Sequence, residues 1–436
     1  MKFEVIEKSK KKRWIIGSIA VIGLISVGIY AGSYAKYQKI EDLKLAEGKI
    51  NYKPYDFKIV AMYKSDDGTN YTEINKMPES GYVINEEKSY CTINNVDKDG
   101  SAKLYTNNGE HIIKNLQKNE KCYLYFDNVT TVKSIDELVN KLSKIAKIES
   151  PTFSNAATTD EGVYRVSDGM YGGNSYYWRG AATTNYVKFA GKCWRIIRIN
   201  GDKTMRLIYD GATCHANGTS TADSIAVAST AYNSSYNRSE YVGWKYTSGS
   251  QRPSSITSGT NAPIKTTLEN WYNSNIGNNT TYSSKIADGK YCNDRNVQSG
   301  QSWASAPSST FYYAAYKRIY TDRAPSLSCA SLDTYSLKVG LITADEVMYA
   351  GGLNTNNTSY YLYNGQNYWT MSPEELYYYS SSGDRGARVF VVNSYGHLDW
   401  YNVNNKVGVR PVINLKADTL FASGGTGTQS NPYVVS

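Results

Sequence analysis

The sequence is poor in the residues and motifs on which many enzymes depend. It has only three histidines in 436 residues, and none of them stands in an HExxH zinc motif. It contains no GxSxG nucleophile elbow, no P-loop, no GxGxxG turn after a strand and no EF-hand spacing. No two of its six cysteines form a CxxC pair, so a zinc knuckle or a thioredoxin-type motif is not expected. The sequence therefore predicts no catalytic residue, no metal and no cofactor.

The excess of basic over acidic residues is too small and too widely spread to indicate a nucleic-acid-binding protein. The formal net charge is +9, and residues 2–13 alone hold six basic residues against two acidic ones. What remains is spread over the rest of the chain, whereas proteins that bind nucleic acid gather basic side chains on one face. We therefore expect no nucleic-acid partner.

An uncharged, mostly apolar stretch follows this basic cluster at residues 14–35. A helix of this length rises about 33 Å, enough for a bilayer core of about 30 Å. The positive-inside rule keeps residues 1–13 in the cytoplasm. We therefore predict a single-pass anchor in the cell membrane, a charged, helix-permissive stalk over 36–50 and an extracellular head. A cleaved signal peptide is the alternative, because Ser33-Tyr34-Ala35 has small-x-small spacing, but the apolar run exceeds the usual h-region of about 7–15 residues.

The even number of cysteines fits an exported chain with disulfides. We expect Cys91 to pair with Cys122 inside a small N-terminal domain, and Cys292 with Cys329 as the next candidate. Free thiols in the core are the alternative, since unpaired cysteines are often buried.

Residues 51–130 show a strand pattern interrupted by turns. Residues 57–63 alternate around apolar side chains, and residues 121–126 form a second such run. Short strands between turn signals predict a small β-sandwich-like domain. Residues 131–159 then read as a helical linker, because Ser134 and Glu137 have capping-box spacing before an amphipathic stretch.

The larger part of the chain, 160–418, mixes strands with Gly/Ser/Asn-rich loops and a few helices. A strand at 193–199 turns at Asn200-Gly201 and returns through 205–209, which predicts a hairpin. Apolar residues from Ile264 to Ile276 predict an amphipathic helix. Three more strands are expected at 387–393, 397–403 and 409–415, followed by a tail over 419–436. The expected fold class is α+β.

Residues 369–415 read as a rigid frame around a contact surface. The frame is 369–373 and 408–415, and Tyr, Ser, Asn and Asp dominate the insert at 374–405. These residue types dominate antibody contact surfaces, where Tyr and Trp supply large amphipathic area at low entropic cost. The alternative is a compositional background, since the chain holds 41 tyrosines.

Several stretches together resemble a known family: CWRIIR at 193–198, LENWY at 268–272, YCNDR at 291–295, VGLITADEV at 339–347, YWTMSP at 368–373 and GVRPVINL at 408–415. In their order and spacing they resemble bacterial C-type-lectin-fold proteins, in particular the variable proteins of diversity-generating retroelements. The resemblance covers about 160–418 and implies a C-type-lectin-like mixed α/β head. In that family a reverse transcriptase rewrites a C-terminal cassette at template adenines.

The resemblance also divides the segment into scaffold and displayed residues. It implies a scaffold of Trp369, Ser372, Ala387, Val389, Phe390, Gly396, Leu398, Gly408, Arg410 and Pro411. It implies a displayed, ligand-binding set of Tyr377, Tyr378, Tyr379, Ser380, Ser382, Asp384, Val391, Tyr395, His397, Asp399, Tyr401 and Asn402. The composition of the segment adds Trp400 to this set. Seven residues of the segment are expected to contribute to one exposed patch: Tyr377, Tyr378, Tyr379, Tyr395, His397, Trp400 and Tyr401.

These observations predict a membrane-anchored binding protein of the cell surface, adhesin-like or receptor-like, whose contact face is diversified by a retroelement. Its expected partner is a protein or glycan on another cell, a phage or a host surface. A non-diversified structural surface protein is one alternative. The other is an enzyme of the formylglycine-generating type, which shares the broad fold but needs a cysteine-centred site that the sequence does not reveal.

Overall fold

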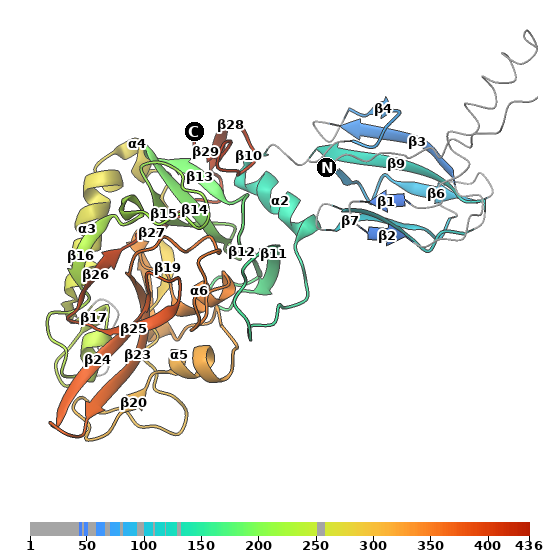
Figure 1. Ribbon diagram of the computed structural model, residues 1–436. Coiled ribbons are helices and arrows are strands. Elements are labelled where there is room, and N and C mark those ends of the chain that lie inside the picture. The colour runs from blue at the N-terminus through green and yellow to red at the C-terminus, as the bar shows by residue number, and fades with distance from the viewer. Residues whose placement is uncertain are drawn as a thin grey trace, which may run out of the picture. The chain divides into compact units, whose positions relative to one another are not determined.

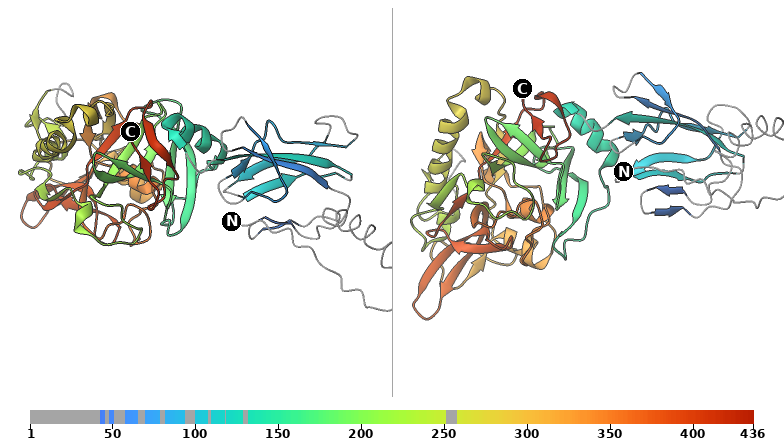
Figure 2. Two further views of the ribbon diagram at one scale, coloured as in Figure 1. Left: turned by 90° about the horizontal axis from the view of Figure 1, so that it is seen from above. Right: turned by 45° about the horizontal axis from the view of Figure 1, so that its top comes forward.

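The computed structural model divides the chain into two compact units, Met1–Thr131 (unit 1) and Val132–Ser436 (unit 2) (Figures 1 and 2). The residues that it describes are 43–45, 48–50, 58–65, 70–78, 82–93, 100–107, 110–117, 119–128, 132–250 and 258–436.

The expected α+β class is wrong, because strands predominate throughout the described residues. The longest helix described there is α2 (Ile135–Ile145), with 11 residues. None of the described helices is both long enough and apolar enough to cross a membrane. The basic segment 1–13 and the apolar stretch 14–35 lie outside the described residues. Sequence patterns identified real helices, but strands outnumber helices among the described residues.

Unit 1 is built on a five-stranded sheet in which β3 and β9 are central neighbours. Two antiparallel pairs, β1 with β2 and β7 with β8, accompany it. The pair β1–β2 falls within the expected stalk, whose described residues are therefore strands and not helix. The strands are β1 (Leu43–Leu45), β2 (Gly48–Ile50), β3 (Lys58–Ser65), β4 (Thr72–Ile74), β5 (Tyr82–Ile84), β6 (Tyr90–Thr92), β7 (Lys103–Asn107), β8 (Glu110–Lys114) and β9 (Lys121–Asn128).

The alternation of β9 explains the core of unit 1. Cys122, Leu124 and Phe126 point to one face and are fully buried. Leu104 of β7 and Ile113 of β8 complete the same hydrophobic cluster. The unit therefore has its own core, independent of the larger unit.

Unit 2 begins with the strand β10 (Val132–Ser134), which pairs with β28 (Leu420–Gly425) near the C-terminus. The following helix α2 buries Ile135, Leu138 and Leu142 in the main core. Ser134 caps this helix, but the Glu137 side chain accepts from the Lys133 backbone N–H, so the expected capping box forms only in part. The expected linker and tail are thus integral parts of unit 2.

An eight-stranded sheet forms one layer of unit 2, with its main path in the order β11-β12-β14-β15-β27-β22. The predicted hairpin at Asn200-Gly201 is confirmed as β14 and β15. The strands of this sheet are β11 (Asp160–Ser167), β12 (Asn174–Gly180), β13 (Tyr186–Phe189), β14 (Lys192–Ile199), β15 (Met205–Gly211), β22 (Val339–Gly340), β27 (Val412–Leu415) and β29 (Tyr433–Val434).

A six-stranded sheet carries the predicted contact segment, with β16-β26-β23-β24-β25 in order and β20 beside β23. Its strands are β16 (Val227–Ala231), β20 (Phe311–Tyr312), β23 (Tyr368–Tyr379), β24 (Asp384–Val392), β25 (Leu398–Asn402) and β26 (Lys406–Val409). The single strand predicted over 409–415 is instead split between β26 and β27, which belong to different sheets. Pro411 lies at the break, where its missing N–H cannot join a ladder.

Helices and two-stranded β pairs make up the rest of unit 2. The amphipathic helix predicted from Ile264 is confirmed as α3, which passes into a π-helical turn. The remaining elements are η1 (Ala222–Ser224), η2 (Ser239–Val242), β17 (Lys245–Tyr246), β18 (Thr260–Asn261), α3 (Pro263–Tyr272), η3 (Asn273–Gly277), α4 (Thr280–Ser283), β19 (Gly289–Cys292), α5 (Ala314–Tyr316), η4 (Lys317–Thr321), η5 (Ser331–Asp333), β21 (Thr334–Leu337) and α6 (Ala344–Tyr349).

Candidate functional site

The hairpin made by β23 and β24 projects from unit 2 and carries most of the predicted contact residues (Figure 1). At its tip, the turn between the strands exposes Ser380 and Ser382. Gly383 closes this turn with φ +73°, in the left-handed region that favours glycine. Because β25 lies beside β24, the three strands form one platform.

The residues predicted as scaffold are buried in and around this platform. They are Trp369, Ser372, Ala387, Val389, Phe390, Gly396, Leu398, Gly408, Arg410 and Pro411. Trp369 donates from its indole Nε1 to the carbonyl oxygen of Thr230 at 2.8 Å. Gly396 has φ +73°, and a Cβ there would lie 1.9 Å from the carbonyl oxygen of Asn357. Larger residues are therefore excluded from this turn.

Strand register divides the predicted contact residues into three groups. In the first group, Tyr377 pairs across from Gly386, and Trp400 pairs across from Phe390. Because side chains alternate between the faces of a strand, this register places one set on a single face. The set is Tyr377, Tyr379, Asp384, Trp400 and Asn402, with Ser380 and Ser382 at the tip.

The second group occupies the opposite face of the same strands. Tyr401 packs partly buried against the main core, and the Tyr378 backbone N–H donates to Thr310 Oγ1 at 2.9 Å. Asp399 also belongs here, and its Oδ2 accepts from Asn393 Nδ2 at 3.1 Å. Val391 was expected to be displayed but is fully buried. It cannot contact a ligand, because both faces of β24 are covered at that level.

The third group, Tyr395 and His397, lies in the turn that joins β24 to β25. This turn is at the opposite end of β24 from the hairpin tip, about 26 Å away at 3.3 Å per residue. Asn393 Oδ1 accepts the backbone N–H of both residues and so fixes the turn. The predicted contact residues are therefore spread over both faces of these strands and both ends of β24.

The first group is organised by Arg388, a residue that the sequence analysis did not select. Its guanidinium carbon lies 3.5 Å from the ring centre of Trp400 and 4.2 Å from that of Tyr377. Its Nη2 donates to the Tyr379 hydroxyl at 3.3 Å. Arg388 itself is 6% exposed, whereas Tyr377 and Trp400 are each 36% exposed. We call these four residues the aromatic face.

The charge of Arg388 is balanced by Glu375, with which it forms a short ion pair. Arg388 Nε also donates to Asn402 Oδ1 at 3.3 Å. A buried guanidinium is tolerated only when it is paired and hydrogen-bonded, and both conditions hold here. The signal in the sequence was the polar position 388 between Ala387 and Val389, on the face that alternation shares with Asp384.

The carboxyl groups of Glu374 and Glu375 on β23 have raised pKa values. Burial raises the pKa of Glu374 well above its usual range, and the charge of Glu375 raises it further against the opposing effect of Arg388. Burial also raises the pKa of Glu375, while Arg388 lowers it. Glu374 therefore holds its proton at a pH where an exposed glutamate is ionised.

Three tyrosines flank this acidic pair. Tyr312 of β20 pairs across from Glu375, and its ring lies tilted against that of Tyr316 with ring centres 4.0 Å apart. Tyr320 contacts Phe390 with ring centres 5.4 Å apart. Burial raises the pKa of all three hydroxyls, and the nearby glutamates raise it further. The aromatic face thus continues into a half-buried tyrosine border.

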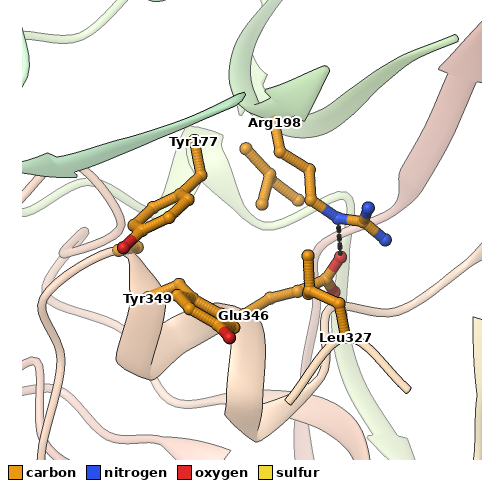
Figure 3. Close-up of a pocket in the computed structure, with 7 residues that line it drawn as sticks. Tyr177, Arg198, Leu327, Glu346 and Tyr349 are labelled. Atoms are coloured by element: carbon orange, nitrogen blue, oxygen red, sulfur yellow. Dashed lines mark hydrogen bonds and ion pairs between the residues drawn. The ribbon is translucent and has the colours of Figure 1, made fainter. Parts of the chain in front are cut away.

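A second polar cluster lies in the interior of unit 2. Arg198 binds Glu346 at 3.1 Å and Asp168 at 2.8 Å, and all three are buried. Figure 3 shows Arg198 and Glu346 with Tyr177 and Tyr349 beside them. The crevice between these side chains has no room for even a water molecule. The cluster therefore acts as an internal brace between β14 and α6, not as a ligand site.

All six cysteines of the chain form disulfides. The predicted pairs Cys91–Cys122 and Cys292–Cys329 are both confirmed, and Cys193–Cys214 is the third. Disulfides form and persist in oxidising environments, which indicates an extracellular or periplasmic location.

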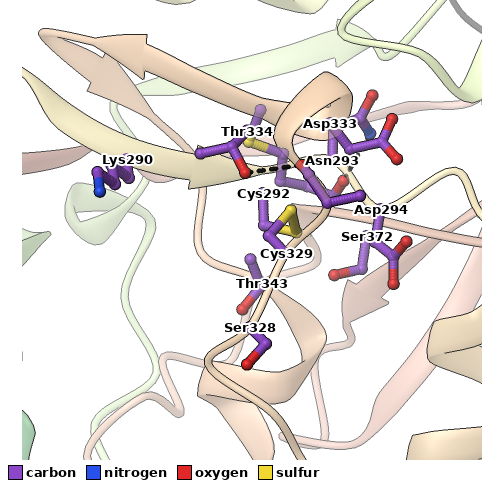
Figure 4. The surroundings of a disulfide bond; sticks show 12 residues. Lys290, Cys292, Asn293, Asp294, Ser328, Cys329, Asp333, Thr334, Thr343 and Ser372 are labelled. Carbon is purple, nitrogen blue, oxygen red and sulfur yellow. Dashed lines mark hydrogen bonds between the residues drawn. A yellow bond between two sulfur atoms is a disulfide. The ribbon is translucent and has the colours of Figure 1, made fainter. Parts of the chain in front are cut away.

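The Cys292–Cys329 bridge fixes the segment that supports β23 (Figure 4). Asn293, next in the chain, is fully buried and donates from Nδ2 to the Met371 carbonyl oxygen at 2.9 Å. Asp294 accepts from Arg318 at 2.8 Å. The bridge therefore stabilises the start of the strand that carries the aromatic face.

No side-chain group in the described part of the chain has the composition and spacing to hold a metal ion. No protein-family model matches the sequence. A search of curated proteins found no match either, and none was found among solved structures.

Proposed function

We propose that this chain is an exported binding protein whose aromatic face contacts a macromolecular ligand. The three disulfides support export, since the cytoplasm keeps thiols reduced. The ligand class is a protein or a glycan on the surface of another cell, a phage or a host. No cofactor takes part in this proposal.

One observation carries the proposal, namely the stack that Tyr377 and Trp400 form with Arg388. Exposed aromatic rings normally lose side-chain entropy when they bind. Here the guanidinium lies between the two rings, and its ion pair with Glu375 anchors it to the sheet. The rings are therefore held in place before a ligand arrives. Trp, Tyr and Arg are also the residue types most enriched among binding hot spots.

An enzyme of the cysteine-centred type has less support. Such chemistry needs a reactive thiol, and each cysteine of this chain is engaged in a disulfide. A structural surface protein without diversification differs from our proposal only in the origin of its contact residues.

The resemblance to variable proteins of diversity-generating retroelements extends the proposal to the gene. We propose that codons within 369–415 are rewritten at adenines. The test is nucleotide sequence: a near-copy of these codons that differs only at adenines, beside a reverse-transcriptase gene, is the expected result. If no such copy lies near the gene, diversification is refuted, while the binding proposal stands.

The binding proposal is tested with labelled full-length chain on two probes, a glycan array and intact bacterial cells. The double variant Tyr377→Ala/Trp400→Ala should lose more than about tenfold in apparent affinity, which corresponds to about 1.4 kcal/mol. The matched control is Tyr236→Ala, which removes a ring that is 42% exposed and lies outside the aromatic face. Equal binding by the wild type and the double variant on every probe that the wild type binds would refute the aromatic face as the contact site.

A further inference from the structure

Glu374 occupies a special place in the sheet beneath the aromatic face. Pro373 pairs with Val389 and Glu375 pairs with Arg388, so two steps along β23 match one step along β24. Glu374 is therefore the extra residue of a β-bulge. Bulges re-aim side chains and are common next to functional sites.

The carboxyl group of Glu374 is buried without compensation. The residue is 1% exposed, and its Oε2 has no hydrogen-bond partner. An ionised carboxylate in such a place would be very costly, so the group stays protonated instead. By contrast, Asp399 of β25 has partners for both oxygens, the Asn393 side chain and the Trp400 backbone N–H.

The charged and titratable groups around Glu374 come from every element that packs there. Glu375 neighbours it on β23, and the charges of Arg388 on β24 and Asp399 on β25 also act on its carboxyl group. The hydroxyl groups of Tyr312 on β20, and of Tyr316 and Tyr320 on the helical segment that follows it, interact with Glu374 as well. Arg388 is the one cation in this set. It pairs with Glu375 and also lies close enough to favour the ionised form of Glu374.

Arg388 therefore connects two roles. It is the group on which Tyr377 and Trp400 stack, and it is the cation that a second carboxylate would attract. If Glu374 loses its proton, two carboxylates compete for one guanidinium. Any shift of that guanidinium by even a fraction of its 3.5 Å separation from Trp400 alters the stack.

We propose that Glu374 is a proton switch for the aromatic face. With Glu374 protonated, Arg388 stays on Glu375 and the rings stay stacked. When Glu374 ionises, Arg388 is drawn toward it, and Tyr377 and Trp400 lose their common support. The face is therefore assembled in mildly acidic surroundings and loosened as the pH rises. The effect of this switch on ligand binding rests on the proposed function. The titration and the change in the stack do not.

Two resonances of the full-length protein test the switch without any ligand. The first is the carboxyl carbon of Glu374 after labelling of glutamate with 13C, assigned by its loss in Glu374→Gln. The second is the fluorine signal of Trp400 after incorporation of 5-fluorotryptophan, assigned by its loss in Trp400→Phe. We expect both to titrate with one midpoint, which lies above the ordinary pKa of a glutamate.

Variants separate the switch from a general pH effect. Glu374→Gln, a neutral isostere, should hold the Trp400 signal at its acidic position throughout the range. Glu149→Gln makes the same change at an exposed glutamate and should titrate like the wild type. If Glu374→Gln folds poorly, Glu374→Met supplies a second neutral side chain of similar length.

Two outcomes would overturn the proposal. One is a Glu374 titration midpoint equal to that of an exposed glutamate, and the other is a Trp400 fluorine signal that does not change as Glu374 titrates. Neither outcome bears on ligand contact. Conversely, a failure of Tyr377→Ala/Trp400→Ala to reduce binding would remove the proposed function while leaving the titration intact.

Discussion

Arg388 and Trp400 form the closest cation–ring contact of the described residues, with the guanidinium carbon 3.5 Å from the ring centre. The contact joins two neighbouring strands, β24 and β25, on the side that faces solvent. Through this contact the buried guanidinium of Arg388 supports the exposed ring of Trp400. Several measurable consequences follow from it and from the packing around it.

Removal of the guanidinium should destabilise unit 2 and free the rings. Arg388→Ala leaves Glu375 as an uncompensated buried carboxylate, and breaking a buried pair in this way typically costs about 3–5 kcal/mol. Urea unfolding followed by tryptophan fluorescence measures the change. The double variant Glu375→Gln/Arg388→Met should recover part of the loss, because it removes both charges. Equal destabilisation by the single and the double variant would contradict the ion-pair account.

Buried and exposed rings of this sheet should respond differently to truncation. Phe390→Ala removes a fully buried ring and should cost about 3–5 kcal/mol of unfolding free energy. Tyr377→Ala removes a ring that is 36% exposed and should cost much less, about 1 kcal/mol including its contact with Arg388. Thermal unfolding of both variants makes the comparison. If Tyr377→Ala unfolds unit 2 as readily as Phe390→Ala, Tyr377 is a core residue.

Unit 1 should lose stability in acid through His111. This side chain is 2% exposed, its Nδ1 lies 2.8 Å from Thr106 Oγ1, and burial lowers its pKa to about 4. The unfolded chain binds the proton near pH 6.5, so the neutral form stabilises the fold above that pH. This contribution, about 3 kcal/mol, is lost as the pH falls from 6.5 toward 4.

Calorimetry of the full-length chain across this pH range measures the effect of His111. The transition of unit 1 is identified by its shift in Leu124→Ala. His111→Gln should flatten its pH dependence between 6.5 and 4. A transition that keeps its full acid dependence in His111→Gln would assign the effect to other groups.

The third disulfide, which no sequence pattern singled out, should be worth about 3 kcal/mol. Cys193 and Cys214 are 21 residues apart, and closing a loop of this length lowers the entropy of the unfolded chain by about that amount. The double variant Cys193→Ser/Cys214→Ser tests this by urea unfolding. Peptide mapping of the unreduced wild type should recover all three bridges, and a mixed pairing would contradict the structure.

Sequence reasoning succeeded where a local signal dominates. The turn at Asn200-Gly201 defines its hairpin. The pairing of Cys91 with Cys122 followed from their place in one small unit, where they lie opposite each other on β6 and β9.

It failed where side-chain direction depends on partners far along the chain. Val391 is apolar in a strand that is buried on both faces, so alternation could not show which side it faces. Likewise, the bulge at Glu374 shifts the phase of β23 against β24, and no local pattern marks it. The role of Arg388 emerges only when three strands are aligned.

The pairing of β10 with β28 has a consequence for the connectivity of unit 2. Ser134 lies opposite Leu420, and the Ser436 backbone N–H donates to the Leu420 carbonyl oxygen at 3.1 Å. The first and the last residues of this unit therefore lie close together. A short peptide could join the two ends, and the ring could be cut in the exposed turn at Gly300 without opening either sheet. The hairpin with the aromatic face would then remain on a circularly permuted chain, because none of its strands contains either end.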